Sequence, residues 1–72
     1  MSNGVGPIAL SDRQLECLRL VAAGQSSPEI ARSLGLSPRT VDEYITDACR
    51  RLGVRTRVQA VVAAMRAGLI QS

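Results

Sequence analysis

Hydrophobic residues recur along most of this chain at intervals of three and four, which is the period of an amphipathic α-helix. The first periodic stretch begins at Ser11 and ends at Gly24. Ser11 followed by Gln14 three residues later is typical of a capping box at a helix N-terminus. A glycine directly after the last periodic residue is typical of a helix C-terminus. We therefore expect a first helix here, with an apolar side formed by Leu15, Leu18 and Val21.

A second, shorter helix is predicted to open at Ser27 and to end at Gly35. Pro28 stands at its first helical position, where the missing N–H costs nothing because that group has no partner within a helix. The acidic Glu29 beside it suits the positive end of the helix dipole. Its apolar stripe consists of Ile30, Ala31 and Leu34.

The third predicted helix, at about 38–52, has the clearest division into two sides. Ser37 caps it, Pro38 is its first residue and Gly53 follows its end. Its apolar side consists of Val41, Ile45, Ala48 and Leu52. Its opposite side consists of Arg39, Asp42, Glu43, Thr46 and Arg50. A side rich in donors and acceptors suits a helix that lies in the DNA major groove, although every amphipathic helix has a solvated side.

A fourth helix is expected between a Thr56–Gln59 capping box and Gly68. Its inner side consists of Ala60, Val61 and Ala64. A second apolar stripe consists of Val58, Val62, Met65 and Leu69 and leaves two readings open, one broad buried face or a contact in a homodimer. The tight turn at 35–37 between two short helices is typical of a helix-turn-helix.

The predicted fold is thus all-α, a compact four-helix bundle that contains a helix-turn-helix. It occupies residues 9–72, after a glycine-rich lead-in at 1–8. A length of 72 residues allows one domain, and 46% hydrophobic residues allow a buried core. Cys17 and Cys49 do not have the spacing of metal ligands. Each falls within a helical pattern, so we expect each to be a small buried or flanking apolar residue rather than part of a redox pair.

The charge of the chain is mildly basic, which is sufficient for phosphate contacts and fits an ordinary soluble surface equally well. The net charge is +3, and all nine cations are arginine. Side chains placed to reach a sugar–phosphate backbone are Thr40, Arg51, Arg55, Thr56 and Arg57. The N-terminus of the second helix, at Ser26 and Ser27, offers free N–H groups for a phosphate. Histidine, lysine and a glycine-rich phosphate loop are missing from the sequence, so we expect no enzyme, no metal and no cofactor. We also expect no membrane span and a cytoplasmic location.

Several motifs stand in a fixed order: LSDRQLECLRLVAAG at 10–24, EIA at 29–31, LGLSPRTV at 34–41, RRLGV at 50–54 and RxQAV at 57–61. In these motifs the chain resembles the LuxR-type (GerE-type) DNA-binding domain of bacterial transcription regulators. The resemblance implies double-stranded DNA as the partner and a third helix in the major groove. It also implies a homodimer through the fourth helix, by way of Val58, Val62 and Met65, and an upstream receiver or ligand-sensing domain.

Carried over position by position, the resemblance assigns base-reading places to Asp42, Glu43 and Thr46, and the helix pattern adds Arg50. Positions that look like backbone contacts are Arg39, Thr40, Arg55 and Arg57. The chain departs from the family at Asp42, where Lys or Arg is common, and Glu43 adds a second acid. These carboxylates suit cytosine amino groups, or ion pairs with Arg39 and Arg50.

Two other functions remain as alternatives. One is a protein-interaction domain of the same fold with lost or weak DNA binding, which the acidic residues of the third helix favour. The other is the promoter-reading helix-turn-helix of a sigma factor, which the additional helix after Gly53 argues against.

Overall fold

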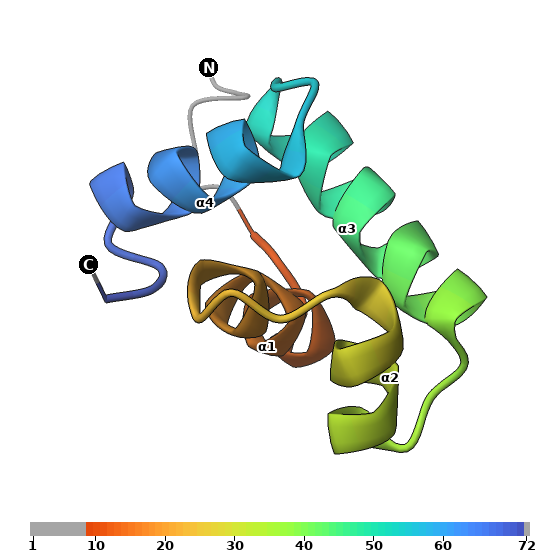
Figure 1. Cartoon of the computed structure of the whole chain (residues 1–72). Coiled ribbons are helices and arrows are strands. Elements are labelled where there is room, and N and C mark those ends of the chain that lie inside the picture. Colours follow the sequence, from red (N-terminus) through yellow and green to blue (C-terminus); the bar gives the residue numbers. More distant parts are fainter. Residues whose placement is uncertain (1–8, 72) are drawn as a thin grey trace.

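The computed structural model describes residues 9–71 and places four helices around one core (Figure 1). The helices are α1 (Asp12–Ala22), α2 (Ser27–Leu34), α3 (Pro38–Leu52) and α4 (Arg57–Arg66). The described residues contain no strand, so the predicted all-α fold with a helix-turn-helix is confirmed. The predicted lead-in at 1–8 lies outside the described residues.

Polar side chains begin the helices, largely as predicted. Ser11 caps α1 in a capping box with Gln14, and Thr56 caps α4 in a capping box with Gln59. Ser37 caps α3 and accepts from the N–H of Thr40 at 3.1 Å. In each case a side-chain oxygen satisfies an N–H that the helix itself cannot pair.

The predicted start of α2 is wrong by one residue. Ser26, not Ser27, is the N-cap, and its hydroxyl accepts from the Glu29 N–H while the Glu29 carboxylate accepts from the Ser26 N–H. This donation from the Ser26 backbone lowers the pKa of Glu29 below its ordinary value. Because a capping box requires a spacing of three, Glu29 selects Ser26 as the cap. Ser27 is therefore already inside the helix.

The turn between α2 and α3 is short because Gly35 and Leu36 are sufficient to end α2. Gly35 adopts a left-handed conformation (φ +70°), which ends α2 without a Cβ clash. Leu36 donates its N–H to Ala31 O at 2.9 Å, and its side chain packs against the core. This pairing is the Schellman arrangement of a helix C-terminus. Ser37 then caps α3 at once.

The core is aliphatic and is shared by all four helices. Residues with less than 2% exposure and the largest volume are Leu18, Ile30, Val41 and Cys17. α1 packs against α3 and α4, and α2 packs mainly against α3. The predicted inner side of α4 is buried, and both cysteines are buried with free thiols, as expected. Burial raises the pKa of each thiol above its ordinary value.

The second apolar stripe of α4 divides into two parts. Met65 and Leu69 are half-buried and pack against the core. Val58 and Val62 are 68% and 41% exposed, so one continuous buried face does not describe the stripe. Along the described part of the chain, no helix combines the length and the apolar character that are needed to cross a membrane.

Candidate nucleic-acid interface

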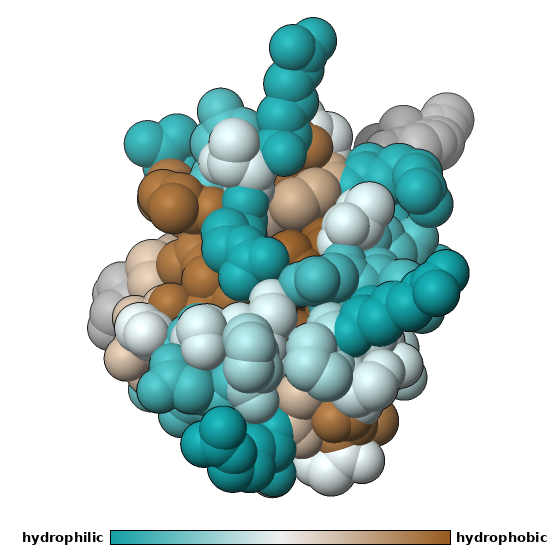
Figure 2. Space-filling view, turned by 45° about the vertical axis from the view of Figure 1, so that its right-hand side comes forward, coloured by the Kyte–Doolittle hydropathy of each residue, from teal (hydrophilic) through white to brown (hydrophobic). Residues whose placement is uncertain are grey.

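The outward side of α3 is polar and open to solvent. Arg39, Glu43, Thr46 and Arg50 are all exposed, and together with Asp42 and Asp47 they line a shallow hollow on the surface. α3 runs along the right of Figure 1. Figure 2 brings that side forward and shows hydrophilic side chains over its top, right and lower left, with hydrophobic patches at the centre left and at the lower right. The predicted polar side of the third helix is thus presented outward.

Two ion pairs cross this outward side, both within α3. Arg39 Nε lies 3.7 Å from a Glu43 carboxylate oxygen, and Arg50 donates to Asp47 Oδ1 at 3.2 Å. The expected pairing of Glu43 with Arg39 is therefore found, whereas Arg50 pairs with Asp47 rather than with Asp42 or Glu43. Exposed pairs at this spacing contribute little to stability and exchange easily for other partners.

Asp42 lies on the flank of α3 and contacts two other helices. Its Oδ1 accepts from the Ser27 hydroxyl at 2.5 Å and from Arg57 Nη2 at 3.4 Å. Both terminal nitrogens of Arg57 also lie 3.3 Å from the Ser27 hydroxyl oxygen. Three helices, α2, α3 and α4, thus meet in one polar cluster of Ser27, Asp42 and Arg57.

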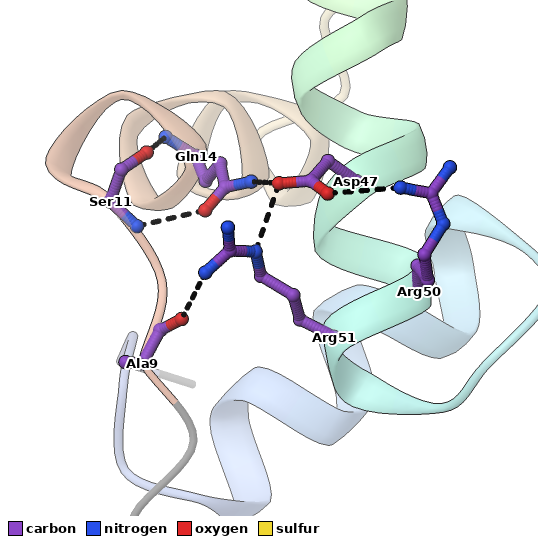
Figure 3. A network of polar contacts seen from close by, with 6 residues as sticks. All are labelled: Ala9, Ser11, Gln14, Asp47, Arg50 and Arg51. Atoms are coloured by element: carbon purple, nitrogen blue, oxygen red, sulfur yellow. Dashed lines mark hydrogen bonds and ion pairs between the residues drawn. The ribbon is translucent and has the colours of Figure 1, made fainter.

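Asp47 lies on the other flank of α3 and connects it to α1 (Figure 3). The amide of Gln14, which is 3% exposed, donates to Asp47 Oδ2, and Arg51 Nε donates to the same oxygen at 2.9 Å. Arg51 also donates to the carbonyl of Ala9 at 3.2 Å. The guanidinium of Arg51, predicted to contact phosphate, is therefore turned toward α1 and the chain before it (Figure 3).

The pKa of Asp47 is lowered from its ordinary value, mainly by the hydrogen bond from Gln14 and then by Arg51. A lowered pKa in the folded state means that ionised Asp47 stabilises the fold. Its contribution is fully present above the unfolded pKa of about 3.9 and is lost as the pH falls through the lower folded value.

We expect Asp47→Asn to lower the free energy of unfolding at neutral pH and to flatten the loss of stability in acid. Urea unfolding of both proteins from pH 7 down to about pH 2 measures this difference. Glu43→Gln is the matched control, since its ion pair lies within α3. Parallel pH profiles for wild type and Asp47→Asn would contradict the assignment.

The remaining predicted phosphate contacts differ in accessibility. Arg55 and Thr56 are exposed beside the start of α4, although the Thr56 hydroxyl already accepts from the Gln59 N–H at 3.1 Å. Thr40 is half-buried and its hydroxyl lies 2.9 Å from that of Ser37. The exposed guanidinium of Arg55 is therefore accessible to a phosphate at the start of α4. The Thr56 hydroxyl can still donate its hydrogen there.

Two features were not predicted from the sequence, the capping box at the start of α2 and the hydrogen bond that joins α1 to α3. The Ser26–Glu29 capping box follows the spacing that was used at Ser11 and Thr56, and that spacing was a sufficient signal. The bond from Gln14 to Asp47 joins residues 33 positions apart, and no local pattern indicates it. Gln14 also serves the α1 cap, a role that accounts for its presence without any tertiary partner.

Comparison with known proteins agrees with this arrangement. A family model described as bacterial regulatory proteins, luxR family, matches residues 9–64. The chain is 41% identical over 61 residues to the HTH-type transcriptional activator RamA of Corynebacterium glutamicum, covering 85% of this chain and 22% of that protein. It is 42% identical over 66 residues to the probable transcriptional regulatory protein NarL of Mycobacterium tuberculosis, covering 92% and 30% respectively. The chain thus spans less than a third of the length of either relative.

A solved structure described as that of the transcription factor GerE superposes with a TM-score of 0.81 at 32% identity. The match covers 83% of this chain and 90% of that one. The likeness therefore extends over nearly the whole of the four-helix arrangement.

Proposed function

Because this chain belongs to the luxR family of bacterial regulatory proteins, we propose that it is the sequence-specific, double-stranded-DNA-binding domain of a transcription regulator. The observation that carries the proposal is the outward side of α3. Four polar side chains, Arg39, Glu43, Thr46 and Arg50, extend from a helix that α1, α2 and α4 hold from behind.

In the proposed complex α3 lies in the major groove, which is wide enough to admit an α-helix. Arg50 is suited to guanine, Glu43 to the cytosine amino group, and Thr46 to either kind of base edge. Arg39 and the edge formed by Arg55 and Thr56 are suited to the sugar–phosphate backbone. Backbone contacts fix the register of α3, and base contacts supply the sequence preference.

Binding to duplex DNA in a salt-dependent manner tests the proposal directly. We expect the logarithm of the affinity to fall linearly with the logarithm of salt, with a slope of about 0.9 for each phosphate neutralised. Fluorescence anisotropy on a labelled duplex of mixed sequence measures this slope. Selection of bound duplexes from a random pool then measures sequence preference. A protein that binds no duplex at low salt would contradict the proposal.

We further propose that two copies dimerise through α4, using the exposed Val58 and Val62 and the half-buried Met65. A groove that is lined by both valines, by Val54 and by small side chains of α4 supports the assignment of Val58 and Val62. A two-fold dimer would contact half-sites spaced by about one helical turn of DNA.

Placing a charge in this surface is expected to keep the protein monomeric on DNA. The double variant Val58→Asp/Val62→Asp should bind a duplex with a stoichiometry of one where the wild type binds as two, because the buried carboxylates would repel each other. Analytical ultracentrifugation of the complexes measures the stoichiometry. Ser33→Asp, an exposed position on α2, is the control. An unchanged stoichiometry in the double variant would rule out this surface.

The acidic residues of α3 favour a second candidate, a protein-interaction domain. Asp42 and Asp47 weaken that case, because both contact other helices of the same chain.

For the DNA-binding domain, the proposal includes a location in the cytoplasm and a role in binding without catalysis or a cofactor. An upstream receiver or ligand-sensing domain is part of the proposal and is supported by the greater length of the relatives.

A further inference from the structure

The cluster of Ser27, Asp42 and Arg57 brings an anion to two residues that were predicted to bind phosphate, Arg57 through its side chain and Ser27 through its backbone N–H. Asp42 Oδ1 is 2.5 Å from the Ser27 hydroxyl and 3.4 Å from Arg57 Nη2. A hydroxyl and a guanidinium are donors that proteins commonly offer to DNA phosphates. The carboxylate oxygen supplies the same kind of acceptor that a phosphate oxygen would supply.

This carboxylate is accessible to exchange. The side chains of Asp42 and Arg57 are 55% and 41% exposed, so solvent and a polyanion can both reach the pair. A pair with this exposure adds little to the free energy of folding. Its main effect is therefore electrostatic, since it compensates the charge of Arg57 at the edge of the proposed interface.

We propose that Asp42 does not read a base but acts as a positioning residue that stands in for a DNA phosphate. In the free protein it holds the Ser27 hydroxyl and the Arg57 guanidinium together, and on binding a phosphate takes its place. This inference rests on the proposed function. It differs from the expectation drawn from the sequence, in which Asp42 belonged to the base-reading set.

Glu43 provides the comparison that makes the inference specific. It is the neighbouring acid on the same helix, it carries the same charge, and its partner is Arg39 within α3 at 3.7 Å. Removing either carboxylate lowers the repulsion between α3 and DNA. Removal of Glu43 frees Arg39, whereas removal of Asp42 frees Arg57 to neutralise a phosphate, so only the effect of Asp42 should depend on Arg57.

The experiment is a double-mutant cycle on a labelled mixed-sequence duplex about three helical turns long, titrated at several salt concentrations. We expect Asp42→Asn to bind about two- to fivefold more tightly than wild type. Its salt slope should be steeper by up to about 0.9, which corresponds to one more neutralised phosphate. In the Arg57→Gln background the gain from Asp42→Asn should shrink, whereas the gain from Glu43→Gln, which frees Arg39 instead, should be the same in both backgrounds.

The outcomes separate cleanly. A gain from Asp42→Asn that is undiminished in the Arg57→Gln background, as is expected for Glu43→Gln, would show a general charge effect and overturn the inference. Weaker binding by Asp42→Asn, restricted to preferred duplexes, would show base reading and overturn it as well. If the wild-type protein binds no duplex, the proposed function falls and the inference falls with it. If the wild-type protein binds duplex but Asp42 and Arg57 show no coupling, the inference is overturned and the proposed function stands.

Discussion

Ile30→Ala is expected to lower the free energy of unfolding by about 2–5 kcal/mol, the cost of removing a large aliphatic side chain from a packed core. Ile30 is fully buried and is the largest side chain that α2 contributes to the core. A chain of 72 residues has a total stability of roughly 4–11 kcal/mol. This single truncation is therefore expected to remove a large part of the total free energy of unfolding.

Urea unfolding monitored by circular dichroism measures the change in the transition midpoint. Arg32→Ala is the matched control, because Arg32 is exposed on the same short helix and its truncation opens no cavity. Since α2 positions the turn that precedes α3, Ile30→Ala should also weaken duplex binding near its unfolding transition. A loss of stability similar to that of Arg32→Ala would show that α2 does not depend on this contact.

Arg50→Ala is expected to have the largest effect on DNA recognition, a loss of about 1–3 kcal/mol, or roughly 5- to 150-fold in affinity, on preferred duplexes. The Arg50 side chain is 73% exposed on the outward side of α3 and ends in a guanidinium that matches the acceptors of guanine. Its bond to Asp47 lies within α3 and is exposed, so the guanidinium can exchange that partner for a base.

The control is Arg13→Ala on α1. Arg13 also forms an ion pair with an acid three residues away, Glu16 at 3.0 Å, although this pair is half-buried, so the two variants remove the same charge and an ion pair of the same spacing. Anisotropy titrations on selected and on mixed-sequence duplexes distinguish recognition from general attraction. Equal losses on both duplexes would assign Arg50 to the phosphate backbone instead.

The elements of this fold were predictable because their signals are local. A cap, a period of hydrophobic residues and a terminal glycine lie within one helix, so the sequence around Ser37 and Gly53 was sufficient to delimit α3. The error at Ser26 arose from weighting Pro28, which is tolerated at either of the first two helical positions, above the spacing to Glu29. At this helix start the preference of proline for the first turn allows two positions for the cap. The reciprocal hydrogen bonds between Ser26 and Glu29 select one of them.

The candidate site was predictable only in part, because its side chains choose partners across the fold. The period of α3 placed Asp42 on the polar side but did not indicate that Ser27 and Arg57 would meet it there. Arg51 was assigned to phosphate from its charge, whereas Asp47 and the Ala9 carbonyl hold it toward α1. The partners of flexible, charged side chains depend on helix packing, which the chain pattern does not specify.

The three-residue turn at 35–37 has a consequence for how this domain tolerates change. Gly35 closes one helix, Leu36 is anchored in the core and Ser37 opens the next, so no residue is spare. Inserting a single residue at the start of α3 would rotate its register by about 100° and carry Thr46 away from its outward direction. New binding preferences are therefore accessible to this scaffold by exchanging side chains on α3, and not by lengthening the loop that precedes it.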